Sequence, residues 1–151
     1  MPLYLEDLVV GKLYGSDEVL VSDESIVEFA RSYDPQPFHL DAEAAKRSVF
    51  GELVASGWQT AALTMRLRVT GELKLAGGWI GLAVEELKWP NPVRPGDRLR
   101  ATTEVIEKRV SSSRPDRGVI KVRTTTYNQR DDVVFITQSV QLVLRREIPS
   151  P

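Results

Sequence analysis

The 151-residue sequence contains no cysteine. This excludes disulfide bonds, catalysis by a thiolate, and zinc or iron–sulfur sites built from cysteine. The sequence also lacks an excess of either charge, because 20 lysine and arginine residues stand against 21 aspartate and glutamate residues. A chain without a strong field of one sign does not recruit polyanions. We therefore expect no nucleic acid and no membrane among its partners, and no bound metal.

Long apolar runs are missing as well. A membrane-spanning helix needs about 20 consecutive apolar residues, and the longest candidates are interrupted by Arg66, Arg68 or Glu85. Residues 1–15 carry acidic side chains where a signal peptide needs basic ones, which predicts a mature protein in the cytoplasm. No break in composition divides the chain, so we expect residues 1–151 to form one domain with a sizeable apolar core.

Three segments have the pattern of helices. Residues 22–30 begin with capping side chains and continue with apolar residues at helical spacing. A second, short helix is expected over 41–46, where Asp41 supplies the cap. The longest helix is predicted over 57–70, before Gly71, with small and apolar residues at positions 58, 61, 62, 65 and 69. That stripe predicts a helix that is largely buried.

The rest of the chain is rich in residues that favour strands. Alternation of apolar and polar side chains predicts a sheet with one buried face and one wet face. A turn at 128–132 should join the last two strands as a hairpin. The expected strands are 14–21, 79–88, 99–105, 119–127 and 134–144. With one buried helix between the first strand and the others, the pattern predicts an α+β fold, an antiparallel sheet wrapped around a helix.

One segment carries residues suited to acid–base chemistry. Residues 33–41 read YDPQPFHLD and hold the only histidine, His39, five positions after Asp34. Two prolines and the lack of periodicity predict a stiff, ordered loop, and a stiff loop keeps proton-transfer groups at fixed separation. A simpler interpretation is that His39 satisfies a carbonyl in a turn and that Asp34 caps one. Spacing alone leaves both interpretations open.

The same residues resemble a known family. Residues 34–41, Asp-Pro-Gln-Pro-Phe-His-Leu-Asp, are similar to the Asp-x-Asn-Pro-x-His-x-Asp motif of MaoC-like dehydratases and R-specific enoyl-CoA hydratases. Residues 55–58, Ala-Ser-Gly-Trp, resemble the start of that family's central helix, and residues 88–97 resemble its strand connection. The sequence departs from the pattern at four positions. These are Tyr33 for Gly, Gln36 for Asn, Ser56 for His, and Met65 where some members have Ser.

The resemblance implies a hot-dog fold that forms a homodimer or a higher assembly of dimers. It implies addition of water to, or removal of water from, an acyl-CoA substrate, with coenzyme A as part of the substrate and no separate cofactor. Asp34 and His39 would exchange the protons. The Gly57 amide, at the positive end of a helix, would hold the thioester oxygen; Gly57 could instead serve only a tight entry to that helix. Candidates to contact the substrate are Phe38, Ser56, Trp58 and Met65, with Leu63 also near the acyl chain and Lys88 or Arg94 near the phosphates.

Two other functions remain open at this point. A hot-dog thioesterase would share the fold and the substrate class but would use a carboxylate to drive hydrolysis. A non-catalytic hot-dog domain would bind acyl chains or serve as a subunit partner, and it would not need Asp34 and His39.

Overall fold

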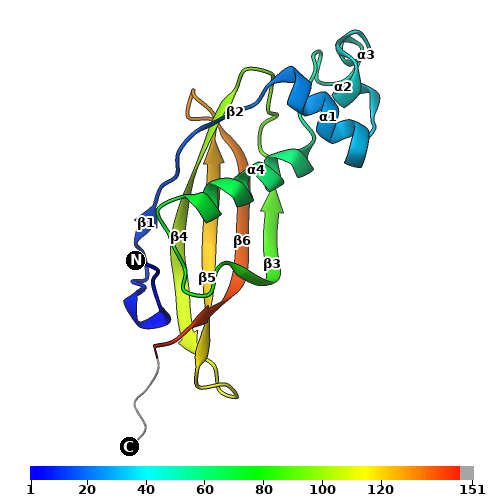
Figure 1. Ribbon diagram of the computed structural model, residues 1–151. Coiled ribbons are helices and arrows are strands. Elements are labelled where there is room, and N and C mark those ends of the chain that lie inside the picture. The colour runs from blue at the N-terminus through cyan, green and yellow to red at the C-terminus, as the bar shows by residue number, and fades with distance from the viewer. Residues whose placement is uncertain (147–151) are drawn as a thin grey trace, which may run out of the picture.

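The computed structural model describes residues 1–146. Its centre is an antiparallel sheet that curves around one long helix, α4 (Figure 1). The strands run in the order β1-β4-β5-β6-β3, and β2 pairs with a second part of β4. The helices are η1 (Leu5–Asp7), α1 (Asp23–Tyr33), α2 (Pro37–Leu40), α3 (Ala42–Lys46) and α4 (Gly57–Thr70); the strands are β1 (Leu13–Tyr14), β2 (Val19–Leu20), β3 (Ile80–Lys88), β4 (Arg98–Val110), β5 (Arg117–Tyr127) and β6 (Val133–Leu144). The predicted α+β arrangement is confirmed.

Buried and more exposed residues alternate along the long strands of the sheet. In β5 every second residue is buried, from Gly118 to Thr126, so one face of the strand lies against the interior. The predicted turn between β5 and β6 is present. Asn128 Oδ1 accepts hydrogen bonds from the backbone N–H groups of Arg130 and Asp132, and Asp131 has a positive φ of 65°. The Asn128 side chain therefore fixes the hairpin turn.

Two apolar clusters fill the interior. One lies under α1 and α4 and includes Ile26, Leu67 and Phe135. The other lies beneath the amino-terminal segment and includes Leu8 and Ile120. Among residues 1–146, no helix combines the length and the apolar character that crossing a membrane requires.

The orientation of α4 differs from the prediction. Trp58, Met65 and Val69, which belong to the apolar stripe expected to be buried, are 57%, 42% and 45% exposed. The helix turns Thr60 and Thr64 toward the sheet instead. Thr60 lines a cavity, and Thr64 is tolerated inside because the sheet presents a hydroxyl group to it. Thr64 Oγ1 lies 2.7 Å from Oγ1 of Thr126.

Two further predictions need correction. The strand expected over 14–21 consists of β1 and β2, separated by a segment in which Ser16 Oγ accepts the backbone N–H of Ala101 in place of a strand partner. The loop expected over 33–41 contains the helical turn α2. Pro37 starts this turn, because proline has the φ of a first helical residue and no N–H to leave unpaired.

Candidate active site

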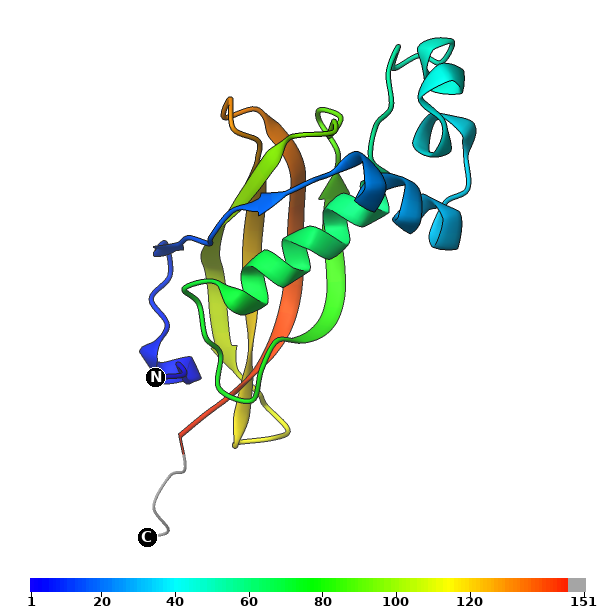
Figure 2. The same cartoon turned by 45° about the horizontal axis from the view of Figure 1, so that its top comes forward.

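Asp34 lies at the end of α1, where three helices gather beside the amino-terminal end of α4 (Figure 2). Ser22 caps the start of α1 by accepting the N–H of Ser25. At the other end Asp34 donates its own backbone N–H to the carbonyl of Ala30, at 2.8 Å. The backbone of Asp34 is therefore anchored to the last turn of a regular helix.

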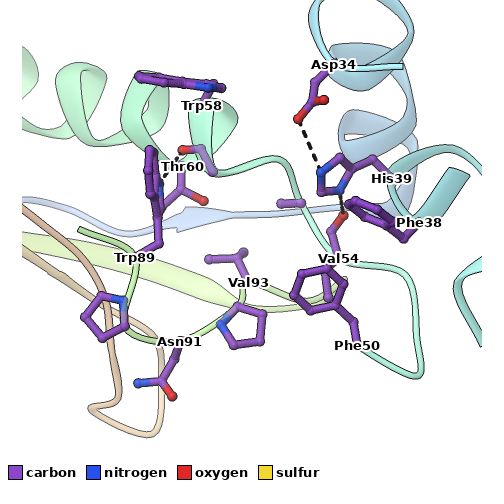
Figure 3. Close-up of a pocket in the computed structure, with 14 residues that line it drawn as sticks. Asp34, Phe38, His39, Phe50, Val54, Trp58, Thr60, Trp89, Asn91 and Val93 are labelled. Atoms are coloured by element: carbon purple, nitrogen blue, oxygen red, sulfur yellow. Dashed lines mark hydrogen bonds and ion pairs between the residues drawn. The ribbon is translucent and has the colours of Figure 1, made fainter. Parts of the chain in front are cut away.

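His39 is buried and held in one orientation. Its Nδ1–H donates to the backbone carbonyl of Val54 at 2.6 Å, because a carbonyl oxygen can only accept. The Phe38 ring packs edge-on against the imidazole, with 4.5 Å between ring centroids. As a result Nε2 is the ring nitrogen free for chemistry, and it lies 3.3 Å from Oδ2 of Asp34 (Figure 3).

The Asp34 carboxylate receives hydrogen bonds on both oxygens. Gln36 donates from Nε2 to Oδ1 at 2.5 Å, and Ser56 donates from Oγ to Oδ2 at 2.7 Å. Burial raises the pKa of Asp34, but the bonds from Gln36 and Ser56 and the charge of His39 together outweigh it, so the pKa lies below its usual value. Asp34 is consequently ionised at neutral pH, and it forms an ion pair with His39 whenever the imidazole is protonated.

Gly57 is the first residue of α4, and its amide lies at the positive end of the helix dipole. Within residues 1–146 this amide has no hydrogen-bond partner. The indole of Trp89 covers the glycine and donates from Nε1 to its carbonyl at 2.8 Å. A Cβ at position 57 would lie 2.6 Å from the indole ring. The contact with Trp89 therefore requires glycine here, whatever the amide binds.

A cavity of about 450 Å³ joins these groups. Asp34 and His39 lie on one side of it, and Trp58 and Trp89 lie on the other (Figure 3). Its lining residues are Asp34, Phe38, His39, Phe50, Val54, Ala55, Gly57, Trp58, Thr60, Trp89, Pro90, Asn91, Pro92 and Val93. The site thus combines an acid–base pair, a free backbone donor and mainly apolar walls, which suits a ligand with an apolar chain and a polarisable carbonyl.

The structure brings together most of the predicted site residues, but not all. Met65 does not line the cavity; it lies two helical turns beyond Gly57, roughly 12 Å along α4 at 1.5 Å per residue. Ser56 is fully buried, and its hydroxyl contacts Asp34 instead of the cavity. Leu63 is also absent from the lining.

Three other candidates already have protein partners. Arg94 pairs with Glu52, and Lys88 lies 3.5 Å from Glu86, so each cation has a carboxylate partner; neither side chain lines the cavity. Asp41 is the cap of α3, with Oδ1 accepting the N–H of Glu43 at 3.0 Å. The interpretation of Asp41 as a helix cap is confirmed.

Several walls of the cavity were not predicted. Phe50 lies between α3 and α4, and its ring packs on Phe38 with 5.3 Å between centroids. Trp89 belongs to the strand connection noted in the sequence, but nothing in its neighbourhood indicated that it would reach the first turn of α4. A contact 32 positions apart in the chain is set by tertiary packing alone.

Comparisons with known proteins agree on one group. The family described as "MaoC like domain" matches residues 8–128. A crystal structure of a MaoC-like dehydratase from Rhodospirillum rubrum is 51% identical and superposes with a TM-score of 0.93, covering 97% of this chain and 99% of that one. The uncharacterized protein YdeM of Bacillus subtilis is 30% identical over 93% of this chain and 99% of its own length. A 3-hydroxybutyryl-CoA dehydratase of Methylorubrum extorquens is 31% identical over 99% of this chain and 89% of its own length.

Proposed function

The chain belongs to the MaoC-like domain family and has the hot-dog fold, and from that premise we propose that it interconverts a 2-enoyl thioester and the corresponding 3-hydroxyacyl thioester. One observation carries this proposal. Asp34 Oδ2 and His39 Nε2 lie 3.3 Å apart in the same cavity as the free amide of Gly57. The relative that acts on 3-hydroxybutyryl-CoA supports a coenzyme A thioester as the substrate.

The Gly57 amide binds the thioester oxygen in this proposal. A hydrogen bond to that oxygen, together with the helix dipole, stabilises the negative charge that collects there when the α-carbon becomes enolate-like. Losing one such donor in other enzymes typically costs about 2.7–4 kcal/mol of transition-state stabilisation. The acyl chain lies between the aromatic walls, where Phe38, Phe50 and Trp58 replace water around it.

Asp34 and His39 move the protons. In the hydration direction, a water molecule between them loses a proton to the Asp34 carboxylate while its oxygen bonds to the β-carbon. The π electrons shift toward the α-carbon and the thioester oxygen, and protonated His39 gives its Nε2 proton to the α-carbon. A proton then passes from Asp34 to Nε2 and restores the pair, and dehydration is the reverse. Because Val54 keeps a proton on Nδ1, Nε2 is the nitrogen that takes part.

We also propose that the chain works as a homodimer, or as an assembly of such dimers. Strand β3 lies at the edge of the sheet, without a strand partner on its outer side among residues 1–146. It exposes Ile80, Leu82 and Val84 by 40%, 53% and 60%. An apolar, unpaired edge strand is a template for pairing with another chain. Val84→Lys should convert the protein to monomers in sedimentation velocity, and an unchanged mass would count against this interface.

The activity is tested with crotonyl-CoA and a panel of longer and branched enoyl-CoA thioesters, by following the loss of enoyl absorbance. We expect turnover by the wild type, and losses of at least 10²-fold in Asp34→Asn and His39→Ala. Asp41→Asn is the matched control, because it changes a nearby carboxylate that only caps α3, and it should keep its activity. No turnover on any substrate, or full activity in both site variants, would refute the proposal. Release of free thiol would instead identify a thioesterase.

A further inference from the structure

Ser56 links the two halves of the site. It is the fully buried residue that precedes α4, and it caps this helix by accepting the N–H of Trp58 at 3.2 Å. The same Oγ lies 2.7 Å from Asp34 Oδ2. A hydroxyl has a single proton to donate, and the Trp58 amide uses one of its lone pairs. The Ser56 proton is therefore directed at Asp34.

The oxygen that Ser56 contacts is the one that faces His39. Oδ2 lies 3.3 Å from Nε2 of His39, while Oδ1 accepts a hydrogen bond from Gln36. With a donor on each oxygen, the carboxylate cannot rotate about its Cβ–Cγ bond without losing both bonds. Hydrogen bonds in series also polarise one another, so the bond from the Trp58 amide strengthens the one from Ser56 to Asp34.

We infer that Ser56 is a positioning residue that connects the start of α4 to the Asp34 carboxylate, aiming Oδ2 at His39 and keeping it ready to accept a proton. This inference rests on the proposed function, because positioning matters for catalysis only if Asp34 is the base. It gives Ser56 a role at a position where the sequence departs from the usual family pattern. It also replaces the prediction that Ser56 contacts the substrate, since the side chain does not line the cavity.

The electrostatics of Asp34 support this role. Burial alone raises the pKa of Asp34, and the donors Gln36 and Ser56 reverse that effect. Among residues 1–146, His39 is the one group whose charge acts on this carboxylate, and no other titratable side chain of these residues lines the cavity. The first turn of α4 and residues 53–56 bring no charged side chain to it. Removing the Ser56 hydroxyl should therefore raise the pH at which Asp34 takes up a proton.

The test compares Ser56→Ala with Ser22→Ala. Ser22 is the matched control, since it also caps a helix with its hydroxyl but does not contact Asp34. We expect Ser56→Ala to lower kcat roughly ten- to hundredfold, the range for a hydrogen bond to a charged group. KM should change little, and the acidic limb of the kcat profile should move to higher pH. Ser22→Ala should keep the wild-type kcat and profile.

Ser56→Gly provides a second test if Ser56→Ala folds poorly, because glycine lacks the hydroxyl but is well tolerated as a helix cap. The acidic limb of its kcat–pH profile should show the same shift. A carbon-13 NMR titration of the Asp34 carboxyl provides a readout that needs no turnover. The midpoint of this titration should move to higher pH in both Ser56 variants and should stay at its wild-type position in Ser22→Ala. An unmoved titration in both Ser56 variants, or an equal shift in Ser22→Ala, would overturn the inference. A wild type without hydratase activity would refute the proposed function but leave the NMR result decisive for Ser56.

Discussion

The contact between Gly57 and Trp89 allows the two possible reasons for a glycine at the start of α4 to be separated. A Cβ at position 57 would lie 2.6 and 2.7 Å from two atoms of the indole, whose Nε1 is held by the Gly57 carbonyl. A rigid ring this close has to move. We expect Gly57→Ala to cost about 1–3 kcal/mol of stability, as overpacking usually does. It should also lower kcat/KM roughly 10²-fold, because Trp89 is a wall of the cavity.

The same substitution should behave differently once the indole is gone. Gly57 does not have a positive φ, so its backbone suits alanine, and alanine restricts the unfolded chain more than glycine does. In a Trp89→Ala background, Gly57→Ala should be neutral or stabilising by about 0.5 kcal/mol. The destabilisation by Gly57→Ala would thus vanish or reverse when Trp89 is absent, a coupling of roughly 1–3.5 kcal/mol.

Urea denaturation of the wild type, both single variants and the double variant measures this coupling directly. The loss of packing caused by Trp89→Ala occurs both in that single variant and in the double variant. It therefore cancels when the two stabilities are compared. A Gly57→Ala variant as stable as the wild type, or equally destabilised with and without Trp89, would refute the reasoning. Activity of the double variant equal to that of Trp89→Ala would show that position 57 contributes its amide and not the lack of a side chain.

Three further outcomes follow from the interior and the site. Thr64→Val leaves the Thr126 hydroxyl without its partner and should cost about 1–3 kcal/mol in urea denaturation, whereas changing both residues to Val should be nearly neutral; additive losses would contradict this. Arg68 is buried, and burial lowers its pKa to about 10; among residues 1–146 its partners are the Ser139 hydroxyl and the Trp79 ring, with no carboxylate acting on it. Arg68→Met should therefore leave the Tm unchanged or raise it, and a large drop would show that the cation is needed. The lowered pKa of Asp34 means that its ionised form stabilises the folded state above the unfolded pKa of about 3.9, and that this stabilisation is lost as pH falls through the folded pKa. The stability difference between wild type and Asp34→Asn should thus narrow on acidification below about pH 4, and parallel pH curves would argue against it.

Much of the secondary structure could be read from local patterns. The helix over 57–70 was located from residue spacing and from Gly71 at its end, although its apolar stripe is not the buried face; the four longer strands follow from residue type and alternation, and the hairpin turn from its polar residues at 128–132. These features depend on neighbours a few positions apart in the chain, so the sequence contains their causes. The pattern could not reveal the break between β1 and β2, because it arises from Ser16 and a strand 85 positions away.

The residues of the site also fall into those that the sequence pointed to and those that only the structure revealed. The residue types and the stiff segment made His39 and Asp34 candidates, and only the resemblance of three motifs to a known family singled them out. The role of Ser56 could not be identified in this way, because its partner Asp34 lies 22 positions earlier and meets it only when α1 packs against α4. Met65 was assigned to the site because it stands where some family members have a serine, but the helix leaves it exposed and outside the cavity.

The sequence by itself therefore determined the main helices and the longer strands, and it marked Asp34 and His39 as candidates for proton exchange, because residue type and short spacing are local properties. Only the tertiary structure decided which face of α4 is buried, that Trp89 covers Gly57, and that Ser56 and Gln36 hold the two oxygens of Asp34. Burial and hydrogen bonding at these positions come from elements distant in sequence, and the same local pattern is compatible with several such packings until the sheet and helices meet.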